Sequence, residues 1–308
     1  MEKIVLITHG DADGIISLSI ALSKFRGEKP RIYFTHPAKL KDTLASLISR
    51  SEFLNRLFVF DMTANEKTML LSSTFEKATW IDHHEWEISN YPPNVEVIVD
   101  KSAASAAELV AKYFNMESEL VELANQIDKD EIKTSEAEFL RNLLGALRWK
   151  YSGALLYNKF LSLSKTLSFH ELAELEQDMS VARLVDGYLK WLKDAEARVL
   201  ERTKTFKVNK IKVAIYETTK FLPMYILTKK LIAHEDAPFD VIIGLVRQID
   251  RAKRRIYTKL ELRTQTNEDV YVIAKEFGGG GHRVAAAATL REFLTIDALL
   301  NKIKELKV

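Results

Sequence analysis

The sequence contains no cysteine, which excludes disulfides, thiolate metal sites and cysteine nucleophiles and is compatible with a reducing cytoplasm. It also lacks any apolar run near the ~18 residues that cross a membrane, so we expect no membrane partner. The first residues, Met1 to Ile7, are too short for the core of a signal peptide. A cytoplasmic location is therefore expected.

Neither sign of charge dominates. The chain has 45 Lys and Arg against 43 Asp and Glu, a formal net charge of +2. This balance neither predicts nor excludes a nucleic-acid partner, because only the local distribution of charge decides that. The hydrophobic share of 47% excludes general disorder. At 308 residues the chain exceeds what one core usually holds, so we expect two domains.

Apolar strands and amphipathic helices alternate through the first half of the chain. Strands are predicted at 4–7, 31–35, 57–60, 78–81 and 95–99, with helices at 15–25, 39–48 and 65–71 and an Ala-rich helix from Ser102. This alternation is typical of an α/β fold with a mostly parallel sheet and helices on its faces.

Acidic and histidine residues follow three of these strands directly. They are His9, Asp11 and Asp13 after the first strand, Asp61 after the third, and Asp82, His83 and His84 after the fourth. Because parallel strands end at one edge of the sheet, where α/β folds bind ligands, we expect these side chains to converge. Each group also has an ordinary interpretation, as a capped turn, a helix N-cap or a polar strand end. Three such coincidences at one edge are harder to accept than one shared site.

Crowded carboxylates repel one another and raise one another's pKa, and a divalent cation removes that cost. Oxygen and imidazole ligands without thiolate suit Mn²⁺ or Mg²⁺, with Zn²⁺, Fe²⁺ and Co²⁺ as further possibilities. The number of ligands favours two ions, ~3.5–4 Å apart, which hold the attacking and leaving oxygens of a phosphate ester. Asp61, alone after a middle strand, is expected to bridge them.

Two segments, His9-Gly10-Asp11-Ala12-Asp13-Gly14 and Asp82-His83-His84, resemble the first and third motifs of the DHH phosphoesterase superfamily, and Asp61 stands where its second motif has an aspartate. Residues 124–128 resemble the segment that supplies a further metal aspartate, here Asp128, with Asp130 as a neighbouring rival. Residues 278–287 resemble the glycine-rich motif of the accompanying DHHA1 domain. The resemblance covers nearly the whole chain and is closest to compact RecJ-like exonucleases and oligoribonucleases, archaeal ones especially.

The resemblance implies a site that holds two Mn²⁺ ions, with Mg²⁺ or Co²⁺ possible. The implied ligands are His9, Asp11, Asp13, Asp61, Asp82, His83 and Asp128, and the implied catalytic residues are Asp82, His83 and His84. His84 would orient the leaving oxygen or donate a proton to it. His9 is either a ligand or a partner of one.

The function that follows is a metal-dependent phosphodiesterase, most simply an exonuclease on single-stranded DNA or RNA, short oligonucleotides included. It would release 5′-mononucleotides in the 3′-to-5′ direction, and a replisome or repair helicase is an implied partner. One alternative is a small-molecule phosphatase or phosphodiesterase acting on phosphoadenosine phosphate, a cyclic dinucleotide or pyrophosphate. An alternative of another class is a non-catalytic replication or repair scaffold.

The expected domains are a DHH catalytic domain over 1–167, a helical connector over 168–206 and a smaller α/β DHHA1 domain over 207–308. In the last, strands are predicted at 210–215, 240–246 and 254–263, helices at 225–233 and 270–277, and a further helix beginning at the four glycines.

Five residues and one weaker candidate are expected to bind substrate in this domain. They are Gly279, Gly280 and Gly281, whose amides can approach an anion, His282 as a further donor, and Arg263 at the family's substrate-arginine position, with Arg247 as the weaker candidate. The basic run 251–255 is interpreted as an exposed hairpin turn or as a binding surface.

Overall fold

The computed structural model describes residues 3–50, 55–169, 172–220, 222–250 and 255–306. The chain divides into two compact units, 1–187 and 188–308. Their boundary lies within one helix, α9 (Met179–Ala197), and inside the predicted connector. The predicted basic run 251–255 falls almost entirely outside the described residues. Among the residues that are described, no helix combines the length and the apolar character needed to cross a membrane.

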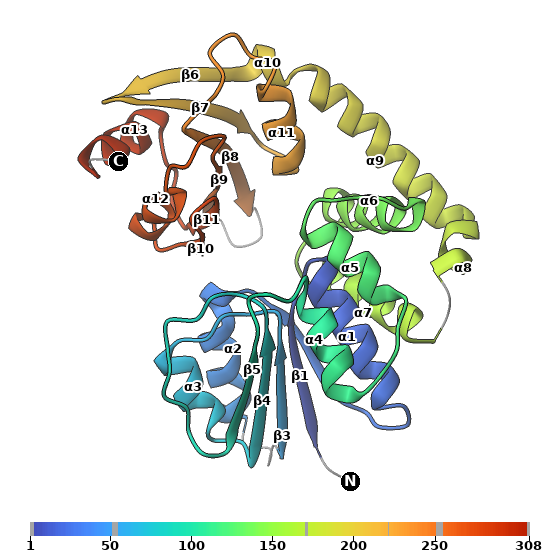
Figure 1. Ribbon diagram of the computed structural model, residues 1–308. Coiled ribbons are helices and arrows are strands. Elements are labelled where there is room, and N and C mark those ends of the chain that lie inside the picture. The colour runs from blue at the N-terminus through green and yellow to red at the C-terminus, as the bar shows by residue number, and fades with distance from the viewer. Residues whose placement is uncertain (1–2, 51–54, 170–171, 221, 251–254, 307–308) are drawn as a thin grey trace. The chain divides into compact units, whose positions relative to one another are not determined.

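A five-stranded parallel sheet forms the centre of the first unit (Figure 1). Its strands are β1 Ile4–His9, β2 Arg31–Thr35, β3 Arg56–Phe60, β4 Lys77–Asp82 and β5 Val95–Val99. All four pairings between neighbouring strands are parallel. The parallel α/β sheet is therefore confirmed, and each predicted strand is present to within two residues at its ends.

Helices cover both faces of this sheet (Figure 1). On one face, α2 (Pro37–Ser49) and α3 (Glu66–Ser72) share an apolar core with the fully buried Trp80 of β4. On the other, Phe58 of β3 packs between Phe25, at the end of α1 (Ala12–Lys24), and Phe114 of α4 (Ala106–Phe114). The unit also contains α5 Leu120–Asp128, α6 Ser135–Lys150, α7 Gly153–Phe169 and α8 Leu172–Gln177.

The order of the strands, β2-β1-β3-β4-β5, reverses between β1 and β3. The chain leaves β1 for β2 on one side and returns to β3 on the other. In open α/β sheets such a reversal creates a crevice at the carboxyl ends of the strands, where ligands bind. The segments that follow β1, β3 and β4 begin at this edge, as the sequence predicts.

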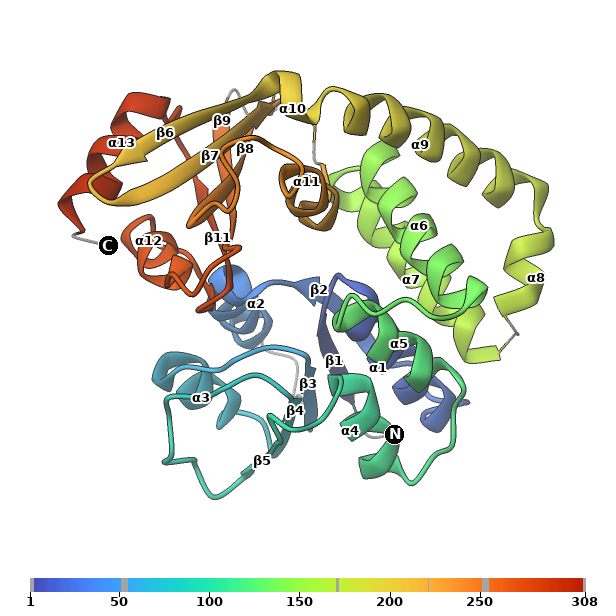
Figure 2. The same ribbon diagram turned by 45° about the horizontal axis from the view of Figure 1, so that its top comes forward.

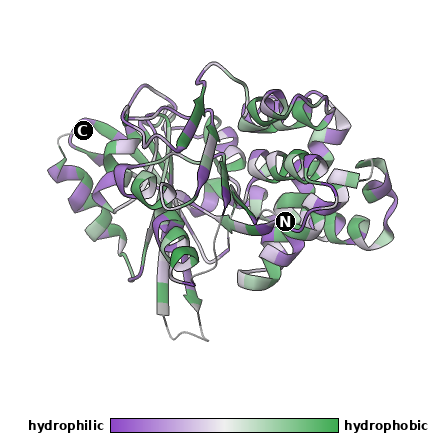
Figure 3. Ribbon diagram, turned by 90° about the horizontal axis from the view of Figure 1, so that it is seen from below, coloured by the Kyte–Doolittle hydropathy of each residue, from purple (hydrophilic) through white to green (hydrophobic). Residues whose placement is uncertain are grey.

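The second unit is built on a six-stranded mixed sheet with the order β10-β11-β9-β8-β7-β6 (Figure 2). Its strands are β6 Thr203–Val208, β7 Ile211–Thr218, β8 Val241–Asp250, β9 Arg255–Arg263, β10 Gly280–His282 and β11 Ala285–Leu290, and its helices are α10 Val199–Arg202, α11 Met224–Leu231, α12 Val270–Glu276 and α13 Ile296–Glu305. Buried residues of α12 and α13 share one apolar core with the sheet. Helices in both units carry hydrophobic and hydrophilic residues in alternating bands (Figure 3), as helices with one buried face do.

One prediction for this unit is wrong. No helix begins at the glycine run 278–281; α12 ends just before it and the chain continues into β10 and β11. Gly278 has a φ of 69°, and the amides of Gly278 and Gly279 donate to the carbonyls of Lys275 and Ala274, both at 2.9 Å. These bonds close the end of α12 with a left-handed cap, which favours glycine. An added Cβ at Gly279 would lie 2.1 Å from the Ala287 carbonyl oxygen, so β11 leaves it no room.

Candidate metal centre

The side chains of the loop after β1 are held in place by contacts with the start of α1. Asp11 is the N-cap of that helix, and its Oδ1 accepts the Gly14 amide at 3.0 Å while its Oδ2 lies 2.5 Å from His9 Nδ1. A Cβ at Gly14 would approach the His9 carbonyl oxygen to 2.5 Å, so only glycine lets α1 begin this close to β1. The motif glycine therefore sets the position of Asp11 against His9.

Asp13 joins this loop to α4. Its carboxylate is 1% exposed, and its two oxygens accept the amides of Ala106 and Ala107, each at 2.7 Å. Burial, reinforced by the charge of Asp128, raises the pKa of Asp13 well above its usual range, although the two amides oppose this. Asp13 Oδ2 also lies 3.6 Å from His83 Nε2.

Asp61 has a backbone φ of 54°, in the left-handed region that a residue other than glycine rarely adopts and that aspartate tolerates better than most. Its Oδ2 lies 3.6 Å from His9 Nδ1, and its Oδ1 lies 4.0 Å from His83 Nε2 and 3.8 Å from His84 Nδ1. Burial and the charge of Asp11 raise its pKa well above the usual range. Among the described residues no donor is bonded to its buried Oδ2, although a hydrogen bond with Asp11 favours the protonated form of the carboxyl group. A buried oxygen in this state fits a cation ligand.

Both side-chain oxygens of Asp82, the last residue of β4, take part in hydrogen bonds. Its Oδ1 accepts the His83 amide at 2.9 Å and lies 2.6 Å from His84 Nδ1, and its Oδ2 accepts Trp86 Nε1 at 2.6 Å. Burial opposes the shift, but His84 and Trp86 lower the pKa of Asp82. Burial likewise opposes the raised pKa of His84, which the bond to Asp82 produces. Asp82 thus orients His84. It is not a member of the three converging groups described below, and its part as a cation ligand stays a prediction.

Three groups of side chains bring their ligand atoms within 4.8 Å of one another. They are His9, Asp11 and Asp61; Asp61, His83 and His84; and Asp13, His83 and Asp128. Two ligands that each lie ~2.1 Å from one octahedral cation are about 3–4.2 Å apart. The spacings around His83 Nε2, 3.6 Å to Asp13, 4.0 Å to Asp61 and 3.5 Å to Asp128, lie in that range. The residues around His83 therefore fit a divalent cation, and Asp61 faces both this group and the one that contains His9.

Asp128 and its rival Asp130 have different surroundings. Asp128 ends α5 and takes part in the group around His83, and burial with the charge of Asp11 raises its pKa. Asp130 lies 3.0 Å from Arg141 Nη1 of α6, in an ion pair. The structure thus brings Asp128, and not Asp130, to the cluster.

Two contributors were missed from the sequence. Trp86 holds Asp82, and Arg148 of α6 donates from Nη2 to the Gly10 carbonyl at 2.6 Å. Burial alone would raise the pKa of Asp11, but the charge and hydrogen bond of His9, a hydrogen bond with Asp61 and, last, the charge of Arg148 bring it below its usual range. No local sequence pattern identifies either residue. A single arginine on an amphipathic helix, for example, is ordinarily a surface residue.

The predicted substrate residues of the second unit lie on β9, β10 and the glycine run. Arg263 pairs with Ala285 of β11, which pairs with His282 of β10. Residues in one row of a sheet point to the same face, so Arg263 and His282 share a face, two strands or about 10 Å apart. Gly280 and Gly281 are exposed, whereas the Gly279 amide is already used in the cap of α12.

Arg247 is occupied by contacts within its own unit. Its guanidinium is paired with Glu217, donates to the Leu294 carbonyl at 2.9 and 3.1 Å, and lies 4.5 Å from the centre of the Phe293 ring. These contacts hold Arg247 in place, and its weaker candidacy for substrate binding stays a prediction.

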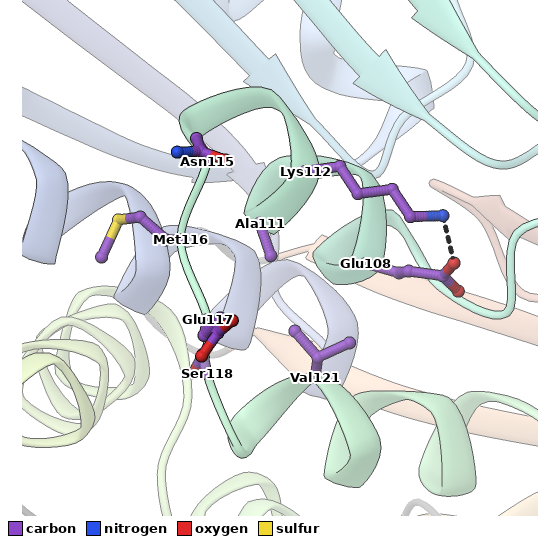
Figure 4. Close-up of a pocket in the computed structure, with 8 residues that line it drawn as sticks. All are labelled: Glu108, Ala111, Lys112, Asn115, Met116, Glu117, Ser118 and Val121. Carbon is purple, nitrogen blue, oxygen red and sulfur yellow. Dashed lines mark hydrogen bonds and ion pairs between the residues drawn. The ribbon is translucent and has the colours of Figure 1, made fainter.

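A hollow of about 650 Å³ lies between α4 and α5 (Figure 4). Its lining consists of Glu108, Ala111, Lys112, Asn115, Met116, Glu117, Ser118 and Val121. Lys112 at its rim is paired with Glu108 at 2.5 Å, and no predicted site residue is among the lining residues. We assign the hollow no part in the chemistry.

No protein-family model and no curated protein matches the sequence. Solved structures do match it. The pGpG-specific phosphodiesterase PggH of Vibrio cholerae has a TM-score of 0.56 at 16% identity, over 98% of this chain and 99% of that chain. Exonuclease RecJ bound to manganese has a TM-score of 0.56 at 14% identity, over 99% and 89%. The DHH domain of a member of a ribosomal-protein family has a TM-score of 0.57 at 17% identity, over 100% and 88%. The chain therefore shares the fold of these structures, which include a DHH domain and an exonuclease RecJ.

Proposed function

We propose that the protein is a metal-dependent phosphodiesterase that degrades single-stranded DNA or RNA, short oligonucleotides included, and releases 5′-mononucleotides in the 3′-to-5′ direction. The observation that carries the proposal is the pair of ligand groups that face the two oxygens of Asp61 at the strand reversal. Like charges this close and this buried are costly without a cation, which argues against a non-catalytic scaffold.

His9, Asp11 and Asp61 would hold one cation, and Asp13, Asp61, His83 and Asp128 the other. When bound, the ions supply positive charge that attracts the phosphodiester and acidifies a water molecule. We propose Mn²⁺, with Mg²⁺ or Co²⁺ as substitutes, because the ligands are oxygen and imidazole and a RecJ of the same fold was solved with manganese.

The remaining residues of the centre position groups for the reaction. Asp82 fixes Nδ1 of His84, which leaves Nε2 on the opposite side of the ring to give a proton to the leaving oxygen. The indole of Trp86 in turn fixes Asp82. Arg148 holds the backbone of the loop between His9 and Asp11. These contacts would keep the reacting groups in place before substrate binds.

In the second unit we propose that Arg263, His282 and the exposed glycines Gly280 and Gly281 bind a phosphate of the substrate. A planar guanidinium can donate two parallel hydrogen bonds to phosphate, and glycine backbone lets an anion approach its amides. A replisome or repair helicase as partner, which the family resemblance implies, stays a prediction.

A second candidate is a phosphodiesterase for small nucleotides. The structure of PggH, which is described as a pGpG-specific phosphodiesterase, matches 98% of this chain over 99% of its own chain. Phosphoadenosine phosphate, a cyclic dinucleotide and pyrophosphate are the other small substrates to test.

The test uses single strands of DNA and RNA from about two to 20 nucleotides, labelled at the 5′ or the 3′ end, with Mn²⁺ and beside the small substrates. Our proposal expects stepwise shortening of the 5′-labelled strands and immediate release of a mononucleotide from the 3′ label. The variant Asp61→Asn should be inactive, whereas Asp42→Asn, an exposed aspartate on α2, should retain activity. Hydrolysis of dinucleotides alone would favour the second candidate. If none of the substrates is hydrolysed, the proposal that the protein is a phosphodiesterase is refuted.

A further inference from the structure

Residues 139–169, most of α6 and all of α7, contain no acidic residue, although the whole chain has 43. The cations of this segment are Arg141, Arg148, Lys150, Lys159 and Lys165. One of them, Arg141, is neutralised by Asp130. Apart from Glu136 and Glu138 in the first turn of α6, these two helices of the first unit carry only positive charge, in a chain with a net charge of only +2.

Two of these cations flank an aromatic ring where α6 meets α7. The ammonium groups of Lys150 and Lys159 lie 5.6 and 5.4 Å from the centre of the Tyr151 ring, and both lysines are exposed. Tyr157, on the first turns of α7, is 41% exposed, and its ring stacks on Phe34 of β2 at 6.3 Å and 28°. We call Lys150, Tyr151, Tyr157 and Lys159 the α6–α7 corner.

The corner is joined to the metal centre by a chain of contacts within the same unit. Phe34, which supports Tyr157, also packs on Phe160 at 5.7 Å. The Arg148 guanidinium lies 5.6 Å from the Phe160 ring and donates to the Gly10 carbonyl at 2.6 Å. Gly10 stands between two of the cation ligands. A strand that ends in the centre would therefore find the corner beside the loop after β1.

We propose that the α6–α7 corner binds a single-stranded nucleic acid whose end lies in the metal centre, an inference that rests on the proposed function. Lys150 and Lys159 attract successive phosphates, and the partly exposed ring of Tyr157 stacks with a base. A corner with two exposed lysines and an exposed aromatic ring, in a segment of the chain without acidic residues, is complementary to a flexible polyanion with aromatic bases. The corner would thus favour a strand of several nucleotides over a mononucleotide or a dinucleotide.

The test measures binding without turnover, by the fluorescence anisotropy of a labelled 12-nucleotide single strand with the full-length protein in EDTA. For Lys150→Gln/Lys159→Gln we expect affinity about tenfold lower at low salt and a salt slope that falls by about 1.4, as two lost phosphate contacts give on a single strand. Tyr157→Ala should lower affinity about five- to 150-fold, and Tyr157→Phe should restore it. The control Lys41→Gln/Lys67→Gln makes the same change of charge on exposed residues of α2 and α3.

The corner is refuted if its variants bind the 12-nucleotide strand as the control pair does, with thermal unfolding showing that all are folded. It is also refuted if wild-type protein binds anionic phospholipid vesicles but no oligonucleotide. Hydrolysis of oligonucleotides by wild-type protein with Mn²⁺ is measured separately. If wild-type protein hydrolyses oligonucleotides but the corner variants bind them normally, only the proposal for the corner is refuted. If the corner variants bind more weakly but wild-type protein hydrolyses no oligonucleotide, the proposed hydrolase is refuted and the corner is supported.

Discussion

Replacing Asp61 by Asn tests two properties of this carboxylate separately. One is the stability that the protein loses by burying it, and the other is its proposed binding of a cation. Asparagine has the same shape and tolerates the left-handed backbone, so the φ of 54° should persist. In cation-free protein the variant loses a buried carboxylate whose Oδ2 has no hydrogen-bond partner in the described part of the chain. Relieving such a group contributes ~1–3 kcal/mol to stability. For a unit of 187 residues, that corresponds to a melting temperature higher by about 2–12 °C.

The size of this stabilisation by Asp61→Asn depends on pH. Because the pKa of Asp61 is raised in the folded state, the folded protein holds that proton more tightly than the unfolded chain does. Wild-type stability without cation therefore falls as pH rises through the raised pKa, and the advantage of the variant grows over the same interval. With Mn²⁺ at 100 times its dissociation constant, wild-type protein should gain ~2.7 kcal/mol, and the variant should gain much less.

The assay is thermal unfolding of wild-type, Asp61→Asn and Asp42→Asn proteins in EDTA and in Mn²⁺, at pH 5.5 and 7.5. The control substitution Asp42→Asn removes one exposed charge from the first unit and leaves the candidate metal centre unchanged. A cation-free Asp61→Asn protein that melts below wild type would refute the reasoning that this carboxylate is strained by its neighbours. An undiminished response of the variant to Mn²⁺ would refute its part as a ligand.

Three further predictions follow from the same geometry. Trp86→Phe removes the indole donor to Asp82 Oδ2 and should lower stability by ~1–3 kcal/mol, seen in urea unfolding, together with a fall in turnover. Gly279→Ala should destabilise the protein by ~1–3 kcal/mol or more, because the new Cβ meets β11, whereas Gly280→Ala meets nothing within 4 Å and should be nearly neutral. Finally, the gain in melting temperature with Mn²⁺ should be larger at pH 7.5 than at pH 5.5, since protons compete for carboxylates of raised pKa.

Each of these has a control or a contrary outcome. Tyr91→Phe removes an exposed hydroxyl donor to the Ile88 carbonyl near Trp86 and should change stability by less than ~0.5 kcal/mol. Equal effects of the two glycine substitutions would show that β11 does not crowd Gly279. A response to Mn²⁺ that is independent of pH would mean that the carboxylates are already ionised without it.

The sheet and the site could be predicted because both follow from local pattern. Strands of four to six residues that alternate with helices fix a parallel sheet, and residues directly after its strands must share an edge. Three of the four ligand segments follow strands in this way. Asp128 has no such marker, because it ends a helix, and only the family motif pointed to it.

The glycine run and Asp82 show where a local pattern is ambiguous. Glycines both precede helices and end them, and the sequence does not say that β11 will pass against Gly279. Asp82 belongs to the same short motif as His83, yet both of its oxygens are bonded to groups that follow it in the chain, including an indole four residues away. Arg148 contacts a backbone carbonyl 138 residues distant, which no periodicity encodes.

The tie between Asp13 and the first amides of α4 has a consequence for how the centre is assembled during folding. The ligands come from segments between His9 and Asp128, and one of them is fixed only once the helix beginning at Ala106 is in place. A nascent chain that stops short of that helix has no complete coordination sphere to offer. We therefore expect sheet and helix packing to gather the carboxylates first, and the proposed cations to bind after folding rather than to nucleate it.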